Sequence, residues 1–283
     1  MPISRDFVNI TKAKEMGIIY IGTSGYSFKD WIGNFYPEKI KSGEMLNFYA
    51  QHFKVVEINS TYYSIPKPSL FESMIERTPS DFNFTVKANS GMTHERTDNQ
   101  SIFDQFENAI RPLVDANRLK GVLLQFPGTF RNTQENRAYL IKCKEIMSEF
   151  PLIAEFRHAS WLKEPTFDFL RQIDMSFCSV DEPELPGLLP PIAVATNRLG
   201  YVRFHGRNKE SWWSGDSAQR YNYLYSDQEL KDWLPKIKHL SESTDELYLF
   251  FNNCHAGHAA ENALRMQDMI QSDLFGNPSE NSI

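Results

Sequence analysis

The chain has 283 residues, of which 41% are hydrophobic and 23% charged, a composition typical of a globular protein with a large core. A formal net charge of −6 excludes a protein that coats nucleic acid or an anionic membrane through bulk charge, although it leaves room for a local basic cleft. Length alone allows one or two domains.

Three widely spaced cysteines, Cys143, Cys178 and Cys254, match neither a disulfide framework nor a zinc knuckle. The segment before Gly17 holds several charged residues and no apolar run of signal-peptide length. No stretch approaches the roughly 18 apolar residues of a membrane span. These features predict a cytoplasmic protein with no membrane partner.

Eight short apolar runs follow one another along the chain at fairly regular intervals. Each is rich in Val, Ile, Phe or Tyr and has the length of a strand. We predict strands at residues 18–22, 53–59, 82–88, 120–126, 152–157, 176–181, 201–206 and 247–253.

Segments with helical spacing separate most of these runs. Apolar residues share one helical face within residues 133–150, and residues 226–242 open with a capping-box pattern at Ser226 before a helical apolar pattern. Pro68 and Pro165 stand where a first helical turn would begin.

Strands that alternate with helices are expected to pair in parallel through crossover connections. Eight such units favour a TIM-type (β/α)8 barrel, an α/β fold, over an open doubly wound sheet. The open sheet usually has fewer strands, and no glycine-rich dinucleotide fingerprint follows the first strand. We therefore predict one barrel domain over residues 18–270, an N-terminal extension (1–17) and a polar C-terminal tail (271–283).

Polar and charged residues recur at alternate positions near the ends of the predicted strands. Side chains of a strand alternate between its faces, so Val56 and Ile58 lie opposite Glu57. If the apolar faces pack on the helices, the polar ones enter the barrel at the end where such barrels carry active sites. The inward set is Glu57, Lys87, Gln125, Glu155, Arg157, Asp181, Arg203, His205 and Asn252.

Burying an unpaired ion costs several kcal/mol or more, so these groups must be paired, hydrated or bound to a ligand. Two interpretations follow. The set forms a ligand pocket, or it forms an internal ion-pair network in which the acids neutralise Lys87, Arg157 and Arg203.

Seven motifs, in order from about residue 18 to about residue 270, resemble those of the YecE-like family, domain of unknown function 72. This resemblance implies a TIM-type barrel with its pocket at the C-terminal face, and it implies no reaction. A likeness of such barrels to DNA-repair endonucleases is an analogy of fold alone. The motifs are TSGYSFKDW (23–31), EINSTYYSIP (57–66), VKANSGMTH (86–94), LLQFPGTF (123–130), EFRHASW (155–161), RFHGR (203–207) and FFNN…AAENA (250–263).

His205 carries the strongest local signal, because a histidine beside Arg203 at the mouth of a barrel strand can act as a general acid or base. Gly206 would let a ligand approach the backbone. The alternative is a neutral histidine bonded to a buried carboxylate. His94 is either a second acid–base group or an ordinary loop histidine.

Lys87, Arg157 and Arg203 would hold a phosphate or carboxylate, with Gln125 and Asn252 beside them. The candidate general bases are carboxylates, whose alternative role is to orient the same cations: Glu57, Glu155 and Asp181. These carboxylates and His205 are acceptable metal ligands, but three nearby cations would oppose a divalent ion. We predict no metal and no cofactor.

Residues 207–225 interleave basic and aromatic residues, a combination that stacks on bases or sugars. Trp212 in this segment, with Tyr26 and Trp161 on other loops, is predicted to form a binding rim. The alternative is that these rings cover the barrel end as ordinary core.

Three hypotheses about function follow. The leading one is an enzyme of metal-independent acid–base chemistry, with hydrolysis favoured, acting on a small substrate that bears a phosphate or carboxylate. The second is a nucleic-acid-binding protein or repair-type nuclease that uses the Trp212–Trp213 loop. The third is a glycoside hydrolase using two of the three carboxylates, which requires side chains that are not all paired with arginine or lysine. The oligomeric state stays open.

Overall fold

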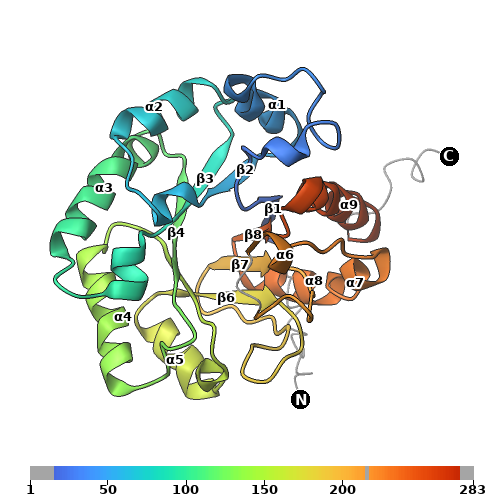
Figure 1. The fold of residues 1–283 in the computed structure, drawn as a ribbon. Coiled ribbons are helices and arrows are strands. Elements are labelled where there is room, and N and C mark those ends of the chain that lie inside the picture. Colours follow the sequence, from blue (N-terminus) through green and yellow to red (C-terminus); the bar gives the residue numbers. More distant parts are fainter. Residues whose placement is uncertain (1–15, 214–216, 275–283) are drawn as a thin grey trace, which may run out of the picture.

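The computed structural model describes residues 16–213 and 217–274 (Figure 1). Most of the predicted N-terminal extension (1–17) and of the predicted C-terminal tail (271–283) therefore lies outside the described residues. The first residues of that tail, 271–273, complete the last helix.

Eight parallel strands form one sheet in the order β1-β8-β7-β6-β5-β4-β3-β2. Between β1 and β2 the sheet closes through an isolated bridge that pairs Ser24 with Glu57, where Gly25 N–H donates to the Glu57 carbonyl at 2.8 Å. The strands are β1 (Ile18–Thr23), β2 (Val55–Ile58), β3 (Asn83–Lys87), β4 (Leu119–Gln125), β5 (Leu152–Glu155), β6 (Ser176–Asp181), β7 (Leu199–Phe204) and β8 (Glu246–Phe251).

The helices lie around the outside of the strands (Figure 1). They are α1 (Met45–His52), α2 (Pro68–Glu76), α3 (Gln100–Asp115), α4 (Gln134–Ile146), α5 (Glu164–Gln172), α6 (Ser217–Arg220), α7 (Asp227–Lys231), α8 (Leu234–Ser243) and α9 (His258–Asp273). This arrangement confirms the predicted TIM-type barrel. Pro68 and Pro165 stand in the first turns of α2 and α5, as predicted. Within the described residues, no helix is long and apolar enough to cross a membrane.

The predicted helix at 226–242 is wrong in its continuity, because two helices, α7 and α8, occupy this segment. Pro235 has no N–H group, and its ring would clash with the carbonyl of Lys231 in a continuous helix. The chain therefore ends α7 at Lys231 and starts α8 one turn later, with Pro235 in its first turn. The predicted capping box at Ser226 is present.

Aromatic side chains fill the barrel below its C-terminal mouth. The rings of Tyr201 and Phe250 lie 5.2 Å apart, and Tyr248 stacks on Tyr20 at 5.0 Å. The Tyr201 hydroxyl donates to Glu57 at 2.7 Å, which joins this aromatic layer to the charged layer above it. The layer provides a packed floor for the charged groups at the mouth.

Candidate active site

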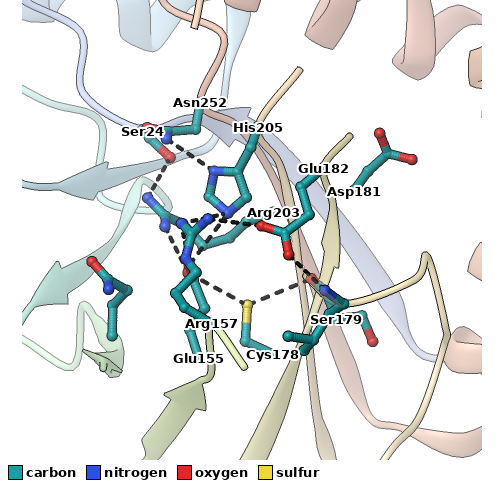
Figure 2. Close-up of polar contacts among 12 residues, drawn as sticks. Ser24, Glu155, Arg157, Cys178, Ser179, Asp181, Glu182, Arg203, His205 and Asn252 are labelled. Atoms are coloured by element: carbon teal, nitrogen blue, oxygen red, sulfur yellow. Dashed lines mark hydrogen bonds and ion pairs between the residues drawn. The ribbon is translucent and has the colours of Figure 1, made fainter. Parts of the chain in front are cut away.

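Arg203, on β7, is the centre of a charged cluster that spans the barrel. Its guanidinium donates to Glu155 on β5 at 2.6 Å and to Glu57 on β2 at 2.7 Å. It also reaches the Ser24 hydroxyl after β1 at 3.3 Å (Figure 2). Only 2% of the Arg203 side chain is exposed, and both carboxylates are fully buried. One cation therefore connects four sides of the barrel.

Arg157 lies above this cluster, at the end of β5, with 15% of its side chain exposed. Its guanidinium is 2.5 Å from Glu155 and 2.9 Å from Glu182. Burial alone would raise the pKa of Glu155, but Arg157 and Arg203 outweigh it and hold that pKa well below its ordinary value. Glu155 is therefore an ionised carboxylate shared by two arginines.

His205 is fully buried and lies between the arginines of this network and Asn252 (Figure 2). Its Nε2 lies 3.0 Å from Arg157 Nη2 and 3.3 Å from Glu155 Oε1, and its Nδ1 lies 3.0 Å from the Asn252 side-chain amide. Burial and the nearby Arg157 lower the pKa of His205 to about 3. At neutral pH this ring is an uncharged imidazole that links the arginine–carboxylate pair to Asn252.

Lys87, at the end of β3, differs from both arginines because, among the described residues, it has no ion-pair partner. Its Nζ donates to the Gln125 side-chain oxygen at 2.9 Å and lies 4.4 Å from the centre of the Tyr62 ring. Burial, and next the charge of Arg203, lower the pKa of Lys87 to about 8. This lysine is therefore a cation that loses its proton more easily than usual.

His94 also packs against Tyr62, with the two ring centres 5.1 Å apart. The Thr93 hydroxyl lies 2.9 Å from His94 Nδ1, and the histidine is partly exposed. Burial and the positive charge of Lys87 lower the pKa of His94 below its ordinary value. The Tyr62 ring therefore packs against both Lys87 and a neutral His94.

A cleft of about 450 Å³ opens at the mouth over the junction of β1, β2 and β8. Ser24 and Asn252, which contact Arg203 and His205, belong to its lining. Its other walls mix aromatic, aliphatic and small polar residues, and include Tyr26 and Tyr63, which is 84% exposed. The cleft therefore borders the charged network through Ser24 and Asn252, which contact Arg203 and His205.

Asp181 is predicted to enter the barrel, and this prediction is wrong. Its carboxylate accepts hydrogen bonds from Trp233 Nε1 and the Tyr225 hydroxyl, each at 2.7 Å, on the outer side of the sheet. Figure 2 shows it turned away from the cluster. Every residue of β6 is buried, so the polarity of its side chains does not show which face of the strand points into the barrel. The β6 side chain that faces the charged cluster is Cys178, whose thiol lies 3.9 Å from Glu155.

Glu182, the residue after β6, occupies the place that the sequence analysis assigned to Asp181. It is the second carboxylate of Arg157 and also accepts the Leu189 N–H at 2.9 Å. Burial raises its pKa, an effect that Arg157 opposes. The alternation of side chains between the two faces of the strand could have found Glu182, had it been continued to the residue after β6.

Among the described residues, no group of three His, Cys, Asp or Glu side chains could hold a metal ion.

The two tryptophans predicted for the binding rim are buried instead. Trp161 stacks on Phe156 at 4.1 Å and donates its indole N–H to the Phe130 carbonyl. Trp212 is 3% exposed, with the Arg220 guanidinium 5.8 Å from its ring. Its neighbour Trp213, in the same loop, is 66% exposed.

Gly206 serves the conformation of the loop rather than open access to the backbone. Its φ is +86°, and an added Cβ would stand 2.7 Å from Tyr223 Cβ. We expect Gly206→Ala to destabilise the fold by about 1 to 3 kcal/mol, measured by urea unfolding. Gly187→Ala is the control, because Gly187 has a φ of +89° with nothing near its Cβ position. Equal losses in both variants would contradict the close contact at Gly206.

Comparisons with known proteins agree on one family. The family described as "Protein of unknown function DUF72" matches residues 20–281. The chain is 35% identical to UPF0759 protein YunF of Bacillus subtilis, over 92% of this chain and 97% of that protein. It is 31% identical to UPF0759 protein YecE of Escherichia coli, over 50% of this chain and 49% of that protein. A crystal structure of a DUF72 family protein from Thermotoga maritima is 42% identical with a TM-score of 0.84, and covers 90% of this chain and 100% of its own.

Proposed function

The chain belongs to the DUF72 family, and we propose that its barrel is an enzyme acting on a small substrate that carries a phosphate or carboxylate group. The chemistry proposed is acid–base and metal-independent, with hydrolysis favoured. The observation that supports this most directly is that the three cations at the mouth differ in the number of carboxylates they contact. Arg157 and Arg203 each contact two carboxylates, whereas Lys87 contacts none among the described residues.

An anion entering the mouth would be drawn to Lys87 and to the outer edge of Arg157. A charge-assisted hydrogen bond to a carboxylate or phosphate oxygen is roughly twice as strong as a neutral one. The Gln125 amide contacts Lys87, and the Asn252 amide contacts His205, so both offer further polar groups near the mouth. These groups lie at the C-terminal face of the barrel, where TIM-barrel enzymes carry their active sites.

The buried acids support these cations rather than react. Glu57 and Glu155 are fully buried and share Arg203, so we assign them the orienting role that was the alternative to general base. His205 is neutral and sealed, which leaves partly exposed His94 as the histidine best placed to exchange a proton with a ligand. Three cations within one network would also repel a divalent metal ion.

The two other hypotheses receive no support from specific contacts. The glycoside-hydrolase hypothesis needs a free carboxylate pair, and each of the inward acids Glu57, Glu155 and Glu182 contacts an arginine. In the loop proposed for nucleic acid, Arg207 pairs with Asp181 and Glu229. We therefore keep the small anionic substrate as the proposal.

Binding of simple anions tests the proposal. Calorimetric titration at pH 7 and constant ionic strength should show saturable binding of pyruvate or inorganic phosphate. Because a hydrogen bond to a charged group contributes about 1.5–3 kcal/mol, Lys87→Met should weaken that binding tenfold or more. Lys54→Met, which removes a lysine paired with Asp81 before β2, is the matched control and should bind as the parent does. Unchanged binding in Lys87→Met would overturn the proposal.

A further inference from the structure

We infer that Lys87 is a covalent catalyst, whose amine forms an imine with the carbonyl carbon of a small aldehyde or ketone that also carries an anionic group. This inference rests on the proposed function and deepens it, because it names a carbonyl compound as the substrate class. It assigns to the lysine a chemical step beyond the attraction of charge.

The contacts of Lys87 suit a nucleophile. Among the described residues, its Nζ makes one hydrogen bond, to the neutral amide oxygen of Gln125, and it rests on the face of Tyr62. A lysine that serves only as a structural counter-ion would be expected against a carboxylate, as Arg157 and Arg203 are here. The acids that could have paired with Lys87 are instead bound to the arginines, and Lys87 is a partly exposed residue at the end of β3.

The surroundings of Lys87 favour its neutral form. Burial penalises the ammonium, and the positive charges of Arg203 and Arg157 repel it, against the opposing attraction of Glu155 and Glu57. With its pKa lowered to about 8, the lysine holds roughly 300-fold more free amine at pH 7 than a lysine of ordinary pKa. Desolvation and a neighbouring cation are the two means by which proteins activate lysine amines.

A proton acceptor is also nearby. His94 shares Tyr62 with Lys87, is partly exposed, and is neutral at pH 7 because burial and the charge of Lys87 lower its pKa. A neutral imidazole can take the proton that the ammonium releases and return it to the oxygen that leaves. Water at the mouth can connect the two groups without a direct contact between them.

The step balances without any oxidant or reductant. The ammonium of Lys87 gives one proton to His94, and the nitrogen lone pair forms a C–N bond to the carbonyl carbon. The carbonyl π electrons move to oxygen, which takes the second N–H proton and becomes a hydroxyl. His94 then returns its proton to this hydroxyl, the C–O bond breaks with loss of water, and the nitrogen lone pair forms the C=N bond. The protonated imine keeps the positive charge of the lysine.

The rest of the mouth fits such a substrate. Arg157, with its exposed edge, would hold the anionic group, so the lysine is free to react. The cleft of about 450 Å³ offers room for the remaining atoms beside Asn59, the residue after β2, which neighbours β3 in the sheet. Within the part of the chain that the structure describes, the buried Asn59 side-chain oxygen has no hydrogen-bond partner, so a donor on the substrate would satisfy it.

Reductive trapping tests the inference. The full-length protein would be treated at pH 7 with glyoxylate and sodium cyanoborohydride, which reduces an imine to a stable secondary amine, and modified lysines would be located by peptide mass spectrometry. We expect Lys87 to be labelled at least tenfold faster than the exposed Lys54. Acetaldehyde, which lacks the carboxylate, should show a smaller preference for Lys87. Lys87→Arg, which keeps a cation but has no primary amine, should abolish that label.

The outcomes separate the two proposals. Labelling of Lys87 no faster than Lys54, with phosphate binding intact, overturns the imine and leaves the anion-binding enzyme standing. Equal preference for Lys87 with glyoxylate and acetaldehyde, together with no binding of phosphate or pyruvate, overturns the anionic substrate instead. Loss of phosphate binding in Lys87→Met, with Lys87 labelled selectively in the parent, supports both.

Discussion

Replacing Arg203 by methionine is expected to destabilise the protein by about 3 to 5 kcal/mol, because removal of one partner leaves buried charges without compensation. Glu57 has no other cation within ion-pair distance among the described residues, whereas Glu155 keeps Arg157. Equilibrium unfolding in urea, followed by circular dichroism, measures the loss. This variant should show the largest effect of any single charge removal at the mouth.

A double variant separates charge from packing. Arg203→Met with Glu57→Gln removes the orphaned acid together with its cation, and should recover a large part of the lost stability. Arg111→Met, which removes an exposed pair with Glu149, is the control and should change little. A double variant as unstable as Arg203→Met alone would show that the guanidinium matters through its packing and not through its charge.

Acid should weaken the fold through His205. The unfolded chain takes up a proton on this histidine below pH 6.5, whereas the folded protein does so only near pH 3. Because the unfolded state then binds more protons, stability falls as pH falls through this window. Between pH 8 and pH 5 the loss from His205 alone is about 2 kcal/mol.

The comparison of His205→Gln with the parent isolates that contribution. The variant is expected to be less stable at pH 8, yet its free energy of unfolding should fall by about 2 kcal/mol less than that of the parent on going to pH 5. His239→Gln, at an exposed position, should keep the parent's slope. Parallel pH curves for parent and His205→Gln would mean that the folded histidine titrates normally.

The barrel was predictable because its signal is repeated eight times. Each strand is a short apolar run between segments of helical spacing, so an error at one end does not change the count. The break at Pro235 shows where a local rule competes with periodicity: the apolar spacing continues through it, but the ring cannot. If the proline rule is applied at Pro235, the sequence predicts two helices within residues 226–242.

The candidate site was predictable only where one face of a strand is polar. Glu57, Glu155 and Arg203 alternate with apolar residues, and the structure brings their charges within hydrogen-bond distance. On β6 both faces are buried, so an acid bonded to Trp233 and Tyr225 looks the same in sequence as one inside the barrel. Which of the three cations lacks a carboxylate partner depends on how far each side chain reaches across the barrel. The spacing of residues along the chain does not give that information.

The closure of the barrel has a consequence for ligand capture. The backbone joins β1 to β2 by a single bridge, Ser24 with Glu57, and the same two residues hold Arg203 through their side chains. The cleft lies directly over this seam, with lining from the ends of both strands. A ligand bound there would contact the ends of β1 and β2 together. It would add contacts across the junction of the barrel that the described backbone holds by a single bridge.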